Sequence, residues 1–229
     1  MTPTAQASGE DSASPARLPA HEVIYRELRA LVLFGDLAPG QAVTIQGLTD
    51  RLGAGMTPVR EAIRRLTAEG ALEFQGNRRV SVPVLTADNI AELILARAWF
   101  DPHLTYRATR HATTADLAGL EHLDAILDQA VMNGDLRGYL ENNYLFHARL
   151  YALADAPILA ELAEGLWLRF GPSLRVVCGR LGTQNLPDKH KATLSAMRAG
   201  DAQGASDAIR DDVVQGMEQV RLSFERGPP

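Results

Sequence analysis

The chain has 229 residues, of which 46% are hydrophobic and 22% are charged, and its formal net charge is -5. This composition excludes a fibrous protein and a chain that is disordered throughout, and no apolar run reaches the roughly 18 residues of a membrane-spanning helix. Cys178 is the only cysteine, so an internal disulfide is excluded. Since the first twenty residues also lack the apolar segment of a secretion signal, we expect a cytoplasmic protein with no membrane partner.

The charge is unevenly distributed along the chain. Residues 1–80 carry nine arginines and nine acidic residues, a balance of zero, whereas residues 81–229 carry 14 basic and 19 acidic residues, a balance of -5. A domain that binds nucleic acid through its bulk charge would be clearly basic. Any contact with DNA must therefore come from a local cluster, and the candidates are Arg60, Arg64, Arg65, Arg78 and Arg79.

Residues 1–20 are rich in Ala, Ser, Pro and Thr and are expected to form a disordered tail, after which short helices follow. Apolar residues at helical spacing from Ile24 predict a first helix that ends at Gly35. Thr44 is placed to cap a second helix of about two turns. Thr57 is expected to be the N-cap of a third helix, with Pro58 in its first position and Gly70 after its end.

The third helix and the segment after it predict a DNA-binding unit. Residues 71–74 and the alternating valines from Val80 indicate two short strands, joined by a tight basic loop over residues 75–79. Three short helices and a hairpin make a winged helix-turn-helix over residues 21–86. Arg60 lies near the start of the third helix, where a side chain can reach base edges in the major groove. Arg64 could do the same or bind a phosphate, and Arg78 and Arg79 could contact the minor groove or the backbone.

The stretch IQGLTDRLGAGMTPVREAIRRLTAEGALEF resembles the DNA-binding domain of the GntR family of bacterial transcription regulators, in which a TPVREA segment opens the recognition helix. The resemblance covers residues 21–86. It implies that Thr57 and Arg60 contact DNA and that the 75–79 loop is the wing. Two positions depart from the family pattern: Met56 replaces the usual arginine before the threonine, and Arg79 replaces the usual glycine at the wing tip.

Residues 87–229 show helical spacing throughout. Six helical blocks are expected, and together they predict an antiparallel all-α bundle, so the whole chain is expected to be mostly α. Their expected bounds are 86–111, 114–132, 135–153, 156–179, 187–199 and 201–226.

Four polar residues of this bundle could hold a metal. Asn143 and His147 are four residues apart and project from one helix face, and His190 and Asp212 lie downstream. Two imidazoles and a carboxylate suffice for zinc, nickel, manganese or iron, with Asn143 as a weak fourth ligand. The alternative from the residues alone is that His147 is a core histidine and Asp212 a solvated partner of a neighbour such as Arg210.

Residues 87–226 also resemble the FCD effector-binding domain of the FadR-type GntR subfamily, in its VanR-like branch. The Phe146-His147 pair matches one histidine ligand of that family and His190 matches another, whereas Asn143 replaces an aspartate and Asp212 a third histidine. The resemblance implies one divalent metal per subunit, zinc, nickel or manganese. It also implies that Arg97 binds a small organic acid; the alternative is an ion pair with Asp101 on the helix surface.

These observations predict a homodimeric DNA-binding regulator, not an enzyme. We expect a repressor that recognises a palindromic operator on double-stranded DNA and responds to a small carboxylate metabolite. One alternative is a metal-dependent enzyme that uses His147, His190 and Asp212. The other is an architectural DNA-binding protein that responds to no effector. An effect of a metabolite on DNA affinity would distinguish the regulator from the architectural protein.

Overall fold

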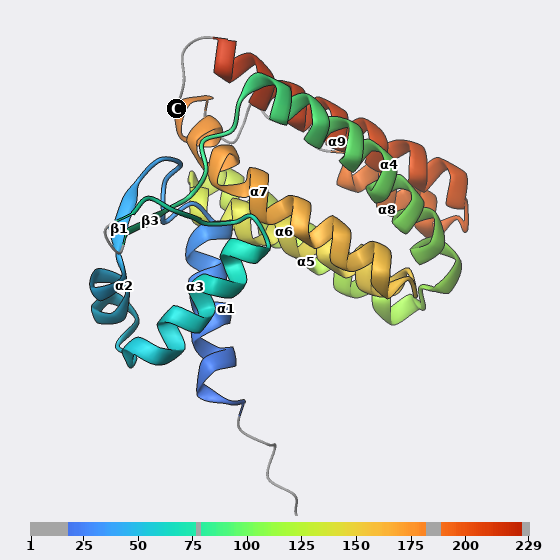
Figure 1. Cartoon of the computed structure of the whole chain (residues 1–229). Coiled ribbons are helices and arrows are strands. Elements are labelled where there is room, and N and C mark those ends of the chain that lie inside the picture. The colour runs from blue at the N-terminus through green and yellow to red at the C-terminus, as the bar shows by residue number, and fades with distance from the viewer. Residues whose placement is uncertain (1–17, 77–78, 182–188, 226–229) are drawn as a thin grey trace, which may run out of the picture.

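The computed structural model describes residues 18–76, 79–181 and 189–225 (Figure 1). Most of the expected tail, residues 1–17, lies outside this range, and the described chain is helical from Ala20. A small N-terminal unit of helices and short strands packs against one end of a larger helical bundle. The first unit comprises α1 (Ala20–Leu33), β1 (Ala42–Thr44), α2 (Ile45–Leu52), α3 (Met56–Ala68), β2 (Glu73–Phe74) and β3 (Arg79–Ser81).

The N-terminal unit is a winged helix-turn-helix. Its three strands form an antiparallel sheet in the order β1-β3-β2, so the predicted hairpin gains a strand that the sequence analysis missed. The expected cap of the second helix is present, because the Thr44 hydroxyl accepts a hydrogen bond from the Gly47 N–H. Apolar faces of the three helices meet in a core that includes Leu28, Leu48, Ile63 and Leu66.

Two local predictions in this unit were wrong. The third helix begins at Met56 with Gly55 as its N-cap, so Thr57 lies inside the first turn and does not cap it. Gly55 has no side chain to mark the start, which explains the shift. Arg79 opens strand β3 opposite Thr44 and is not part of the loop. Arg78 lies outside the described residues.

The C-terminal part is the expected antiparallel bundle, with six helices among its described residues. Two of them begin at the expected starts, because Thr86 forms a capping box and the Asp135 carboxylate accepts from the Gly138 N–H. Helix α5 begins at the expected Thr114, and its cap is Thr113, which also forms a capping box. Helix α9 packs along α4, and α5 along α6 (Figure 1). The expected ends at Pro187 and Arg226 fall outside the described residues. The helices are α4 (Ala87–His111), α5 (Thr114–Asn133), α6 (Leu136–Leu153), α7 (Pro157–Leu181), α8 (His190–Arg198) and α9 (Ala202–Glu225).

The two parts meet where α1 packs on α7. Gly171 of α7 lies so close to the end of α1 that a Cβ atom added there would be 2.4 Å from the Leu33 carbonyl oxygen. Close by, the Arg29 guanidinium is 3.2 Å from the Glu164 carboxylate and donates a hydrogen bond to the Tyr144 hydroxyl. The junction thus combines a close backbone approach with polar contacts from α1 to α6 and α7.

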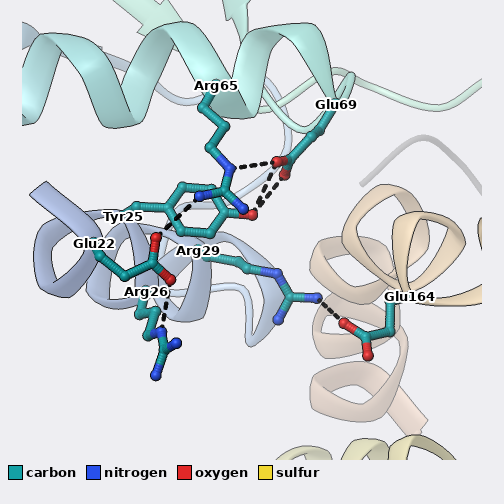
Figure 2. A network of polar contacts seen from close by, with 7 residues as sticks. All are labelled: Glu22, Tyr25, Arg26, Arg29, Arg65, Glu69 and Glu164. Carbon is teal, nitrogen blue, oxygen red and sulfur yellow. Dashed lines mark hydrogen bonds and ion pairs between the residues drawn. The ribbon is translucent and has the colours of Figure 1, made fainter. Parts of the chain in front are cut away.

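Figure 2 shows the polar contacts on the α1 side of this junction. The Tyr25 hydroxyl donates to the Glu69 carboxylate at 2.9 Å, and the Arg65 guanidinium lies over the Tyr25 ring, 3.5 Å from its centroid. Arg65 also pairs with Glu22 and Glu69, so it joins α1 to α3. We call this set the junction network: Glu22, Tyr25, Arg26, Arg29, Arg65, Glu69 and Glu164.

Candidate functional site

The first candidate surface is the outer face of α3. Thr57, Arg60 and Arg64 are all exposed there, opposite the buried side of the helix. The Arg64 guanidinium lies 3.2 Å from Glu61, but both side chains are more than half exposed, so solvent screens the pair. Arg79 is exposed at the start of β3. The arrangement leaves two arginines on the outer face of α3, Arg60 and Arg64, accessible to a ligand outside the domain.

Arg65 does not belong to this surface, although it is close in sequence to the other arginines and was predicted to join their cluster. Its guanidinium turns back toward α1 and is held by Glu22, Glu69 and the face of Tyr25 (Figure 2). Hydrophobic periodicity places Arg65 outside the core but cannot show that α1 supplies its partners. The basic cluster is therefore smaller than the sequence indicated.

The second candidate site is a cavity of about 40 Å³ inside the helical bundle. Helices α4, α6, α8 and α9 each contribute polar side chains to it, and α7 contributes aromatic and aliphatic ones. All of the residues predicted as metal or effector ligands line this one cavity: Arg97, Asn143, His147, His190 and Asp212.

Three of these side chains converge closely. His147 Nε2 lies 3.4 Å and His190 Nε2 lies 4.0 Å from the same atom, Oδ2 of Asp212. Ligand atoms from all three residues lie within 4.8 Å of one another. The other Asp212 oxygen accepts a hydrogen bond from the Lys189 backbone N–H at 2.9 Å, which holds the carboxylate in this orientation. Asp212 is therefore not the solvated partner of a neighbour that the sequence allowed as an alternative.

The environment of Asp212 keeps it ionised. Burial would raise the pKa of this carboxyl, but the nearby His147 and His190 imidazoles and the Lys189 backbone N–H outweigh burial and lower the pKa to about 2. Both imidazoles are almost fully buried. The cluster thus offers a carboxylate and two imidazoles in a space that is shielded from solvent.

Arg97 forms the ion pair with Asp101 that the sequence allowed, but the pair is not on the helix surface. The Arg97 Nη2–Asp101 Oδ2 distance is 2.6 Å, and both side chains are buried. The guanidinium also packs on the rings of Trp167 and Phe170, 4.4 and 4.5 Å from their centroids. Within the described part of the chain, Arg97 Nε has no hydrogen-bond partner. Arg97 is thus fixed by Asp101 and retains an N–H group without an acceptor.

Two carboxylates that the sequence did not indicate as histidine partners lie next to the Nδ1 atoms of His147 and His190. Asp101 Oδ2 lies 3.4 Å from His147 Nδ1, and Asp124 Oδ1 lies 3.5 Å from His190 Nδ1. Lys191 Nζ lies 3.5 Å from the other Asp124 oxygen. Acidic side chains therefore alternate with basic or imidazole side chains in a series that ends at the exposed Lys191. We call this series the buried charged chain: Arg97, Asp101, His147, Asp212, His190, Asp124 and Lys191.

Comparison with known proteins identifies both parts of the chain. Residues 20–82 match the model of bacterial regulatory proteins of the GntR family, and residues 92–214, more than half of the chain, match the FCD domain. This protein is a GntR-family regulator with an FCD domain. Members of this family are DNA-binding transcription regulators. This GntR-family regulator therefore controls transcription and is not an enzyme.

Relatives of this GntR-family regulator cover nearly its whole length. The HTH-type transcriptional regulator McbR of Escherichia coli (strain K12) is 28% identical over 206 residues, which cover 89% of this chain and 93% of McbR. The HTH-type transcriptional repressor GlaR of the same organism is 23% identical over 209 residues, 83% of this chain and 90% of GlaR. The solved structure of E. coli McbR/YncC superimposes with a TM-score of 0.85 at 26% identity, over 91% of this chain and all of that one. Among the described residues of the GntR-family regulator, no helix has the length and apolarity needed to cross a membrane.

Proposed function

We propose that this regulator is a cytoplasmic repressor that binds a palindromic operator as a homodimer and responds to a small carboxylate. Residues 21–86 would form the DNA-binding unit, and residues 87–229 the effector-binding and dimerising unit. The observation that carries the proposal is the pairing of an exposed arginine face on α3 with a buried cluster of metal-ligand side chains in the second unit. Repression, relieved by the effector, is supported by a relative that is named a repressor.

DNA recognition is assigned to Thr57, Arg60, Arg64, Arg78 and Arg79. Arg60 is the base-reading candidate because it is exposed in the first turns of α3, where arginine can donate two hydrogen bonds to guanine. Arg60→Ala should weaken binding to an operator selected from random DNA by about 1–3 kcal/mol and relax the sequence preference. Arg26→Ala, which removes an exposed arginine from α1, is the control. Equal sequence preference in wild type and Arg60→Ala, measured by fluorescence anisotropy, would contradict the assignment.

The buried cluster fits a divalent metal. Ligand atoms at roughly 2.1 Å around a tetrahedral ion lie roughly 3.4 Å apart, and the histidine–Asp212 distances of 3.4 and 4.0 Å are close to this spacing. They are also longer than direct hydrogen bonds. His147, His190 and Asp212 would hold one zinc, nickel or manganese ion per subunit, with Asn143 as a further oxygen ligand. Once bound, the metal would supply a positive charge with open positions for an anion.

Arg97 would complete the anion site, because the residue lines the same cavity and its Nε–H group has no acceptor among the described residues. The cavity of about 40 Å³ accommodates a few atoms beside an ion. An organic acid of several carbons therefore requires the lining helices to separate. Such a movement gives the effector different affinities for two arrangements of the protein, which is what control of DNA binding requires.

One experiment tests the metal and the effector together. Wild type, His147→Ala and His122→Ala, which changes an exposed histidine of α5, are loaded with zinc and analysed by native mass spectrometry. We expect one zinc per subunit in wild type and His122→Ala and none in His147→Ala. Operator affinity of the loaded wild type is then titrated with short mono- and dicarboxylates. Zinc retained by His147→Ala would reject the metal site, and an affinity that no carboxylate changes would favour the architectural alternative.

Homodimerisation is supported by an exposed apolar patch on α4 and α7. Trp99 is 75% exposed, and Leu95, Ile158 and Leu162 are each more than half exposed. A groove lined by Leu95, Ala96, Phe100 and Leu159 lies directly beside Trp99, so the patch contains both a projecting ring and an apolar recess. A two-fold interface pairs one patch with itself, and a patch with a projecting ring beside an apolar recess would suit such a pairing. The expected occupant is thus a second copy of the chain.

Trp99→Glu tests the dimer, because it places a charge at the centre of the patch. We expect a monomer by sedimentation, with unchanged circular dichroism. Met132→Glu is the matched control, since Met132 is an exposed apolar residue of α5 outside the patch. A Trp99→Glu variant that remains dimeric would place the interface elsewhere.

A further inference from the structure

Each of the two histidines of the candidate metal site has an aspartate next to its Nδ1 atom. His147 directs Nε2 toward Asp212 and Nδ1 toward Asp101, while His190 directs Nε2 toward Asp212 and Nδ1 toward Asp124. The two imidazoles come from different helices, and so do the two aspartates, which lie on α4 and α5. The same carboxylate–imidazole arrangement therefore occurs twice around one central carboxylate.

A metal at the centre would select one tautomer for each ring. It would bind the Asp212 oxygen and the lone pair of each Nε2, so the proton of a neutral imidazole would lie on Nδ1. In that tautomer the Nδ1–H group of His147 faces Asp101 and that of His190 faces Asp124. Each Nδ1–carboxylate distance would need to shorten by only roughly 0.5 Å to reach ordinary hydrogen-bond length.

The two aspartates are themselves anchored. Asp101 accepts from the buried Arg97 guanidinium at 2.6 Å, and Asp124 lies 3.5 Å from the Lys191 ammonium. His190 is also stacked on Phe146, with ring centroids 3.8 Å apart and planes only 13° from parallel. Rings that are fixed in this way lose little freedom when they bind a metal, which increases its affinity.

We propose that Asp101 and Asp124 are positioning residues that set the tautomer of His147 and His190 and thereby make both Nε2 atoms metal ligands. The proposal rests on the metal site proposed above. It adds that metal affinity depends on two residues that do not touch the ion. It also links Arg97, the anion-binding candidate, to His147 through one shared aspartate.

Asp124→Asn is the cleaner test, because Asp101 is completely buried with Arg97 and its loss endangers the fold. Asp128→Asn is a matched control: Asp128 is on the same helix and pairs with the same Lys191 at 2.8 Å, but no contact joins it to His190 among the described residues. Zinc affinity is measured by competition with a chromophoric chelator. We expect Asp124→Asn to lose about 10–100-fold in affinity and Asp128→Asn to be unchanged, with equal circular dichroism in both.

Nuclear magnetic resonance of the zinc-loaded wild type gives a second readout that needs no variant. With ¹⁵N-labelled histidine, we expect both rings to bind zinc through Nε2 and to carry the proton on Nδ1. A proton on Nε2 of His190 would overturn the proposal, and so would wild-type zinc affinity in Asp124→Asn while His190→Ala binds no zinc. If wild type itself binds no zinc, the metal site fails as well. The two failures are therefore distinguishable.

Discussion

The junction network and the buried charged chain are built from the same kinds of residue in opposite environments. In the junction network, Arg65 and Arg26 are more than half exposed, so water competes for every ion pair they form. In the buried charged chain, Arg97, Asp101 and both histidines are almost completely excluded from solvent. Exposed pairs contribute about 0–1 kcal/mol each, whereas losing one member of a buried pair costs about 3–5 kcal/mol.

This difference indicates what each network is for. A buried ion pair rarely stabilises a fold more than apolar side chains of the same size would, so charges retained in a core point to function. The junction network instead orients α1, α3 and α7 at the surface, where small energies suffice. The largest mutational effects on stability are therefore expected at the residues that we propose for ligand binding, and not at the contact between the two parts.

Arg97→Met is the test of this comparison with the largest expected effect. The methionine leaves the Asp101 carboxylate in the core without its guanidinium partner, and we expect the free energy of unfolding in urea to fall by about 3–5 kcal/mol. The double variant Arg97→Met/Asp101→Leu removes both charges and should recover most of this loss. A loss below about 1 kcal/mol in the single variant would show that the pair behaves like an exposed one.

Gly171→Ala tests whether the junction depends on close packing more than on its ion pairs. The added Cβ would lie 2.4 Å from the Leu33 carbonyl oxygen, so α7 must move away from α1, and we expect a loss of about 1–3 kcal/mol. Gly179→Ala is the matched control on the same helix, because a Cβ there meets nothing within 4 Å. Because alanine has a higher helix propensity than glycine, Gly179→Ala should raise the free energy of unfolding by about 0.5–1 kcal/mol. Equal thermal shifts in the two variants would contradict the close contact.

The sequence predicted the helical part of the fold well, because its helices carry local signals. Thr86 and Asp135 mark two starts with side chains that accept backbone hydrogen bonds, and Gly134 marks an end with φ of 66°. The sequence gives no such signal where backbone conformation and pairing, and not a side chain, determine where an element begins. Gly55 begins α3 without a side-chain cap, and β1 is three residues long and owes its conformation to pairing with β3.

The candidate site was predictable only in its inner part. His147 and His190 stand out through a family resemblance, and the structure brings both to one cavity with Asn143 and Asp212. Asp101 and Asp124 gave no such signal. The spacing of Arg97 and Asp101 predicts an ion pair, but it cannot show whether α9 and α6 cover it. Only tertiary packing turns a common surface pattern into part of a buried site.

The smallest predicted effect concerns Tyr25, which belongs to the junction network but is buried. Burial, together with the hydrogen bond to Glu69, raises the pKa of the Tyr25 hydroxyl to about 12, whereas the unfolded chain has a tyrosine pKa of about 10. The unfolded state therefore loses this proton first as the pH rises, and the contribution of the hydroxyl is complete below about pH 10 and disappears as the pH approaches 12. Tyr25→Phe lacks this proton but keeps a ring beneath Arg65.

At neutral pH, Tyr25→Phe should be about 1 kcal/mol less stable than wild type, because Glu69 loses a hydrogen-bond donor. Urea midpoints measured from about pH 7 to about pH 11 should show this difference shrinking above pH 10. A difference that stays constant would mean that the hydroxyl titrates as if it were in water. The Tyr25–Glu69 pair would then behave like an exposed contact, although its hydrogen bond is partly buried.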